Sequence, residues 1–139
     1  MDDFRSQLTA LIDEIVASGQ EPSFLVADLQ GIDHIKKAHG QESFDKFRGA
    51  AVDAITSAGR GCDAFTYGDD RIVAVLAGFK RLQTFSMIDK LRRGLPLLAQ
   101  SFDCMLAPQF DIIEYDADSG AGGVILQLVR KPAPRSEAA

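Results

Sequence analysis

The sequence predicts a single α+β domain in which helices pack on one face of a mainly antiparallel sheet. Three observations lead to this fold class. Apolar residues recur every three to four positions over several segments, as in helices buried along one side. Short apolar runs bounded by Gly, Pro and Asp alternate with these segments, as in strands. The chain has 139 residues, 46% of them apolar, which suffices for the core of one domain.

The N-terminal half is predicted to form three helices and one strand. Each helix shows apolar residues at helical spacing and stops at a glycine (Gly19, Gly40 and Gly59), a residue that readily adopts the left-handed conformation that ends a helix. The strand is the mostly apolar run Ser-Phe-Leu-Val-Ala-Asp that follows Pro22. The predicted helices are 2–18, 31–40 and 41–58, and the predicted strand is 23–28.

Two apolar runs, 62–67 and 71–77, flank a Tyr-Gly-Asp-Asp turn and predict a β-hairpin. The turn places two carboxylates, Asp69 and Asp70, at the hairpin tip. Glycine and aspartate suit a tight turn for backbone reasons alone. Two carboxylates near Asp28, the last residue of the first strand, would equally suit a metal and phosphate site. Both interpretations stay open at this point.

The C-terminal half is predicted to contain one helix and a second hairpin. Residues 80–95 carry apolar side chains at helical spacing with cations largely on other faces, and Pro96 interrupts this helix. Residues 109–116 and the run Val-Ile-Leu-Gln-Leu-Val-Arg-Lys are interpreted as the two strands of the hairpin. The tail 132–139 lacks apolar content and is predicted to be disordered, so the folded domain is expected to span 1–131.

Charge and composition exclude several classes of function. The net charge of −5 argues against a broad surface for duplex nucleic acid or an anionic membrane. No apolar run approaches the roughly 20 residues of a membrane span, and the N-terminus does not resemble a signal peptide, so a cytoplasmic protein is expected. Cys62 and Cys104 belong to no Cys-x-x-Cys or Cys/His cluster, which argues against a disulfide framework or a zinc site.

Taken together, these motifs resemble the GGDEF domain of diguanylate cyclases. The family pattern is D-x-D-x-F-K-x-x-N-D-x-x-G-H-x-x-G-D, then R-x-x-D, then G-G-[DE]-E-F on a hairpin tip. Here FLVADLQGIDHIKKAHGQESFDKF, RGCD and YGDDRIVAVL follow that order, and the resemblance runs from about Phe24 to Leu95. No single motif is intact, so the combined spacings carry the resemblance. It implies a palm-like, ferredoxin-related fold of bacterial type, with the family's C-terminal helix replaced by the predicted second hairpin.

The resemblance implies a remnant metal and nucleotide site. Asp28 matches the first metal-binding aspartate, and Asp70 matches the second metal carboxylate, so Mg²⁺ is the implied cofactor. Asp45 matches the aspartate that reads the guanine edge in the family. A register shifted by one residue would make Asp69 the metal carboxylate instead. In the preferred register the hairpin signature is occupied by Gly68, Asp69, Asp70, Arg71 and Ile72.

Departures from the family pattern predict a loss of catalysis. Asp69 stands where the family has a glycine, and its charge would repel a triphosphate. Arg71 reverses the charge of the acidic residue at the reacting 3′-hydroxyl. The chain is therefore expected not to be an enzyme, and a weak Mg²⁺-dependent cyclase that uses Asp28 and Asp70 is the alternative. The nucleotide loop also departs at three positions, Lys36, Gln41 and Phe44.

Arg60 and Asp63 preserve the family's R-x-x-D motif. The resemblance implies a receptor site for cyclic di-GMP, in which the arginine pairs with a phosphate and stacks on guanine while the aspartate accepts from the guanine edge. A second arginine usually completes such a site, and Arg81, Arg92 or Arg93 would supply it. A solvated arginine and aspartate on the surface is the alternative.

These observations favour a catalytically inactive regulatory module of a signalling pathway. The module either binds cyclic di-GMP through the R-x-x-D motif or acts as a protein-interaction domain, with a partner protein or a second copy as its partner. A scaffold that binds no nucleotide, and docks through its N-terminal helix or C-terminal segment, is the remaining interpretation.

Overall fold

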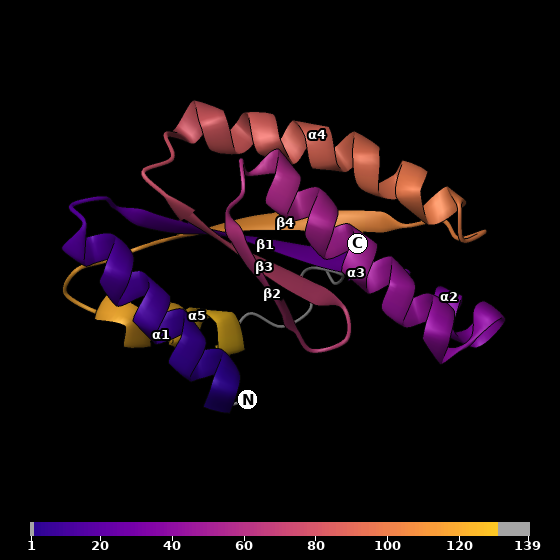
Figure 1. Ribbon diagram of the computed structural model, residues 1–139, viewed down its shortest axis with the longest axis horizontal. Helices are drawn as coiled ribbons and strands as arrows, with labels where there is room; N and C mark the ends of the chain where they lie inside the picture. Colours follow the sequence, from indigo (N-terminus) through magenta and orange to yellow (C-terminus); the bar gives the residue numbers. More distant parts are fainter. Residues whose placement is uncertain (1, 131–139) are drawn as a thin grey trace.

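In the computed structural model the described residues, 2–130, form a four-stranded sheet with helices on both faces (Figure 1). The strand order is β2-β3-β1-β4, and every neighbouring pair is antiparallel, which confirms the predicted fold class. The predicted disordered tail, 132–139, lies outside the described residues. The elements are α1 (Asp2–Ala17), β1 (Pro22–Gln30), α2 (Asp33–His39), α3 (Gln41–Ala58), β2 (Asp63–Tyr67), β3 (Arg71–Ala77), α4 (Arg81–Gln100), β4 (Ala107–Glu114) and α5 (Gly120–Arg130).

Alternate residues of the central strands face opposite sides of the sheet and build two separate cores. In β1, Leu25, Ala27 and Leu29 belong to the core under α3 and α4. Phe24 and Val26 belong to the core under α1 and α5, and β3 alternates in the same way. The expectation that helices cover only one face was wrong, because strands that are apolar on both sides must be covered on both sides.

The predicted C-terminal hairpin was also wrong, since Gly120–Arg130 form α5. Val124 and Leu128 are four positions apart, are 1% and 2% exposed, and pack in the same core as α1. Figure 1 shows α5 beside α1, on the side of the sheet opposite α4. A short apolar run fits a strand or a buried helix equally well, so its periodicity did not separate the two. No hairpin therefore replaces the family's C-terminal helix.

α4 does not stop before Pro96 as predicted but continues to Gln100. Proline removes one backbone hydrogen bond from a helix interior. On either side of it, Leu95 and Ala99 are fully buried in the core under α3 and α4. Packing of these side chains offsets the lost hydrogen bond and holds the last turns in helical form. No helix among the described residues combines the length and apolar character needed to cross a membrane.

β1 is longer than predicted and changes the position of Asp28. The strand continues two residues past Asp28 to Gln30, so Asp28 lies inside the strand instead of at its end. Asp28 is flanked on both sides, because its Cα pairs with Arg71 of β3 and with Gln109 of β4. This carboxylate therefore belongs to the interior of the sheet.

Candidate functional site

Asp28, the predicted first metal carboxylate, is buried. The residue is 5% exposed, and both side-chain oxygens are shielded from solvent. Arg71 stands directly opposite on β3. Side chains that face each other in an antiparallel pair have Cβ atoms about 4.5–5.5 Å apart, a distance at which opposite charges attract. A cation thus stands across from this carboxylate at the position where the family pattern has an acid.

The hairpin tip carries Asp69 and Asp70, which are both exposed. Gly68 has a φ of 69°, a left-handed conformation that glycine adopts without strain. Two hydrogen bonds anchor the tip. The backbone N–H of Leu29 donates to the carbonyl of Asp70 at 2.7 Å, and Nη2 of Arg48 donates to the carbonyl of Gly68 at 3.5 Å. The end of β1 and helix α3 therefore fix the position of the tip.

A cavity of about 260 Å³, here called the hairpin cavity, lies between this tip and α2. Asp69 and Asp70 line it together with Lys36 and Phe44, whereas Asp28 does not. The two predicted metal carboxylates, Asp28 and Asp70, therefore do not both line the hairpin cavity. Within residues 2–130, no group of three or more His, Cys, Asp or Glu side chains is placed to hold a metal ion.

Phe44 fills the wall of the hairpin cavity. Its ring is 1% exposed, with Nζ of Lys36 5.3 Å and Cζ of Arg48 5.4 Å from the ring centroid, within reach of cation–π attraction. The family pattern has a glycine here, so a buried ring occupies space that glycine would leave open. Asp45, predicted to read guanine, is exposed outside this cavity and accepts a hydrogen bond from Nε2 of Gln41 at 2.9 Å.

Arg60 and Asp63 meet at a second cavity of about 450 Å³, here called the Arg60 cavity, between α1 and the sheet. Both side chains belong to exposed residues, and Glu14 of α1 adds a second carboxylate to the lining. Arg60 has a φ of 60°, so the turn after α3 holds a non-glycine residue in the left-handed region. Arg60 also lines an adjoining cavity of about 220 Å³ together with Lys90.

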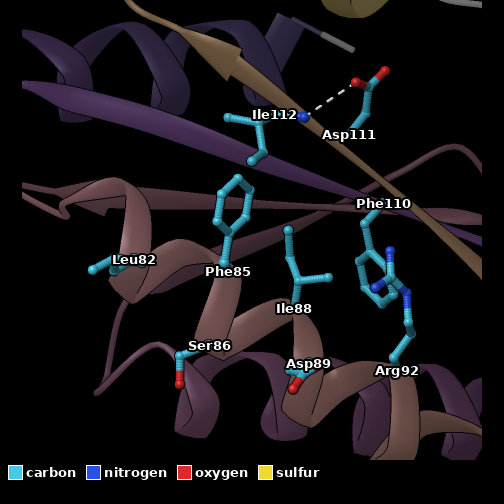
Figure 2. A pocket seen from close by; sticks show the side chains of 9 residues that line it. All are labelled: Leu82, Phe85, Ser86, Ile88, Asp89, Arg92, Phe110, Asp111 and Ile112. Carbon is cyan, nitrogen blue, oxygen red and sulfur yellow. Dashed lines mark hydrogen bonds between the residues drawn. The ribbon is translucent and has the colours of Figure 1, made fainter.

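The structure does not bring the predicted second arginine to either of these cavities. Arg81 instead pairs with Glu114, with Nη2 and Oε2 3.3 Å apart. Arg92 lies over the ring of Phe110, with Cζ 5.9 Å from the centroid (Figure 2). Arg93 pairs with a carboxylate one helical turn earlier. None of the three candidate arginines therefore lines the Arg60 cavity or the cavity that adjoins it.

Sequence reasoning missed two cations. Lys90 lines the cavity that adjoins the Arg60 cavity, and Arg48 contacts the hairpin tip and the ring of Phe44. The sequence holds a signal for Lys90. It follows Met87 by three positions and therefore shares a helix face with a buried residue that points towards the end of α3. The signal for Arg48 is weaker, since its contact with Gly68 joins residues 20 positions apart.

Cys62 lines the Arg60 cavity, and its thiol is held in the neutral form. Burial, with a smaller contribution from the charge of Asp63, raises the pKa of Cys62 from 9.0 to about 11. The pKa of the Cys62 thiol is therefore higher in the folded than in the unfolded protein. The stability that the buried neutral thiol contributes is fully present below about pH 9 and is lost as the pH rises towards 11.

We expect iodoacetamide to alkylate Cys62 slowly near neutral pH, because the thiolate is the reacting form. The test uses a Cys104→Ser variant, so that Cys62 is the remaining thiol, and follows alkylation by intact mass spectrometry as a function of pH. The rate should still be rising at pH values where an unburied thiol has reached its plateau. A rate that reaches half of its plateau value near pH 9, as for an unburied thiol, would contradict the raised pKa.

Comparison with solved structures identifies the fold. A sensory box/GGDEF family protein from Caulobacter crescentus matches with a TM-score of 0.69 and 16% identity, over 100% of this chain and 93% of that one. The GGDEF domain of DgcB from Caulobacter crescentus, in complex with c-di-GMP, matches with a TM-score of 0.64 and 12% identity, over 89% and 77%. The active GGEEF domain of a diguanylate cyclase from Vibrio cholerae matches with a TM-score of 0.60 and 13% identity, over 94% and 90%.

No protein-family model matches the sequence, and a comparison with curated proteins finds no match. At the identities above, structural likeness establishes the fold, whereas activity depends on the residues of the site. The predicted palm-like, GGDEF-like fold is confirmed, and this chain has the fold of the GGDEF domains of diguanylate cyclases.

Proposed function

We propose that the protein is a catalytically inactive, GGDEF-like regulatory module that binds cyclic di-GMP through Arg60 and Asp63. The supporting observation is that these two side chains line one cavity. A guanidinium can pair with a phosphate and stack on a guanine, and a carboxylate can accept from the N–H groups of the guanine edge. The cavity volume of about 450 Å³ lies within the usual 300–1,000 Å³ of small-molecule sites.

Charge decides which further residue belongs to the proposed site. The Arg60 cavity contains one cation and the carboxylates of Asp63 and Glu14. Cyclic di-GMP carries two phosphates, so a second cation is needed to offset the repulsion between them and these carboxylates. Lys90 supplies it from the adjoining cavity, where it lies with Arg60. We therefore assign Lys90, and not Arg81, as the second cation.

The proposed loss of catalysis rests on Arg71 and Phe44. As arranged here, Asp28 and Asp70 do not fit a shared Mg²⁺ site, since the first is buried opposite Arg71 and the second is at the exposed tip. Phe44 takes up space beside that tip. Catalytic groups that act as a unit lose most of their rate when one member is lost. We therefore expect no turnover of GTP.

Isothermal titration with cyclic di-GMP tests the receptor. We expect micromolar binding by the wild type and at least about tenfold weaker binding by Arg60→Ala, because a charge-assisted hydrogen bond contributes about 1.5–3 kcal/mol. Lys90→Ala should weaken binding as well. Arg81→Ala is the matched control and should retain the wild-type affinity, since Arg81 is directed towards Glu114.

Two outcomes would contradict the proposal in different ways. Silence of the wild type, or equal binding by wild type and Arg60→Ala, would exclude a receptor at the Arg60 cavity. Incubation with GTP and Mg²⁺, analysed by chromatography, tests the second half of the proposal. Cyclic di-GMP formed by the wild type but not by Asp70→Asn would establish the weak cyclase instead.

A further inference from the structure

Two cavities of opposite electrostatic character meet at Arg60. The Arg60 cavity is lined by one cation and by the carboxylates of Glu14 and Asp63. The adjoining cavity of about 220 Å³, here called the Lys90 cavity, is lined by Arg60 and Lys90, and none of the described residues that line it is a carboxylate. Arg60 and Phe79 line both cavities. A ligand that extends across Arg60 would therefore place one end among carboxylates and the other end among cations.

The Lys90 cavity suits a phosphate. Arg60 and Lys90 supply two positive charges, and Ser86, on the same helix as Lys90, supplies a hydroxyl that can donate a hydrogen bond. A phosphate in the Arg60 cavity would face two carboxylates and one cation, which is unfavourable. The charges therefore assign a phosphate of the ligand to the Lys90 cavity and the attached nucleoside to the Arg60 cavity.

The Arg60 cavity suits a flat base that carries N–H donors. Its apolar lining comes from two elements, with Leu11 and Ile15 on α1 and Val75 and Ala77 on β3. Apolar side chains from two elements can pack on the faces of a flat ring, and a few polar groups then fix the orientation of its edge. The two carboxylates of the lining are acceptors, so they select a ring whose edge donates.

Guanine has more N–H donors along one edge than a single carboxylate can accept. One donor is on N1 and two are on the exocyclic amino nitrogen N2. The two oxygens of Asp63 can accept the N1 donor and one N2 donor side by side, which leaves the second N2 donor without a partner. Glu14 is the other carboxylate of the same lining and can accept it.

We infer that Glu14 of α1 determines the specificity of the site for guanine. The base lies in the Arg60 cavity between Asp63 and Glu14, its phosphate lies in the Lys90 cavity, and Arg60 lies between the two. This inference deepens the proposed function and rests on it for the location of the site. Helix α1 is then part of the recognition surface in addition to covering the core.

Cyclic di-IMP tests the role of Glu14, because its hypoxanthine bases lack the N2 amino group. In isothermal titration we expect the wild type to bind cyclic di-GMP at least about tenfold more tightly than cyclic di-IMP. Glu14→Ala should lower this ratio at least about fivefold. The ratio is the informative quantity, because removal of the Glu14 charge also weakens the repulsion of the phosphates, and it does so equally for both ligands.

Two further variants separate base recognition from charge. Asp13→Ala is the matched control, since it removes the same charge from the neighbouring position of α1, outside the lining of the Arg60 cavity, and should keep the wild-type ratio. Lys90→Ala should weaken the binding of both ligands to the same extent, because both carry the phosphates. An equal fall of the ratio in Asp13→Ala and Glu14→Ala would overturn the inference.

Failure of this inference can be told apart from failure of the receptor. Binding of cyclic di-GMP that Arg60→Ala weakens, with the same ratio in the wild type and Glu14→Ala, would overturn the role of Glu14 and leave the receptor in place. GMP and IMP are titrated in parallel, because one nucleotide can reach both cavities. Glu14-dependent preference for GMP without binding of cyclic di-GMP would uphold the inference and exclude the receptor. Silence with all four nucleotides would overturn both.

Discussion

Arg71→Glu is expected to lower the free energy of unfolding by about 3 kcal/mol, because it places two like charges opposite each other across β1 and β3. One of the two would be the carboxylate of Asp28, which is buried. Removing the partner of a buried charge costs more than a surface ion pair contributes. Urea denaturation at pH 7, followed by circular dichroism, measures the change.

Two further variants separate this effect from a general loss of packing. Arg71→Lys keeps the charge and should cost much less than Arg71→Glu. A double-mutant cycle compares Asp28→Asn, Arg71→Gln and the double variant. The double variant should lose less free energy of unfolding than the two single variants lose together, because it leaves neither charge without its opposite. Strict additivity, or wild-type stability of Arg71→Glu, would show that the facing positions do not interact.

Phe44→Ala is expected to cost about 3–5 kcal/mol, the range measured when a large aromatic side chain is removed from a core. The ring is 1% exposed and belongs to the core under α3 and α4. Lys36 and Arg48 would in addition lose their cation–π contacts with it. The free energy of unfolding in urea measures the loss.

The control for Phe44→Ala is Leu97→Ala, because Leu97 is 63% exposed and its truncation should change stability by no more than about 0.5 kcal/mol. If Phe44→Ala cost as little as this control, the ring would not be a packed part of the core. The hairpin cavity would then be available to a ligand without any substitution.

Much of the fold could be predicted because its signals are local. The helix predicted over 41–58 matches α3, since apolar residues recur regularly between two glycines. The hairpin could be predicted from its Tyr-Gly-Asp-Asp turn. α5 could not, because a run such as Val-Ile-Leu-Gln-Leu-Val reveals its conformation only through the surface that it covers. The predicted interruption of α4 at Pro96 was wrong for a similar reason. Packing by Leu95 and Ala99 outweighs the tendency of proline to end a helix.

The same distinction between local sequence signals and long-range packing applies to the candidate site. Arg60 and Asp63 are three positions apart, and the structure places both on one cavity. Burial of Asp28 could not be predicted, because it depends on β4, which pairs with β1 from about 80 positions further along the chain. The direction of Arg81 could not be predicted either, since its partner Glu114 is 33 positions away. Whether Arg60 and Asp63 bind a nucleotide stays a prediction.

Helix α1 contacts both the Arg60 cavity and the β2–β3 hairpin. It lines the Arg60 cavity with Leu11 and Ile15, and at its other end Phe4 packs against Tyr67 with ring centroids 5.1 Å apart. A helix of 16 residues is about 24 Å long, so a tilt of α1 as one rigid rod would move both of its ends. A ligand that wedges against Ile15 would tilt this rod and shift Phe4 on its aromatic neighbour. A ligand in the Arg60 cavity would then change the surroundings of Tyr67, which lies beside the hairpin tip. Shifts of the Tyr67 ring resonances in an NMR spectrum would detect this change.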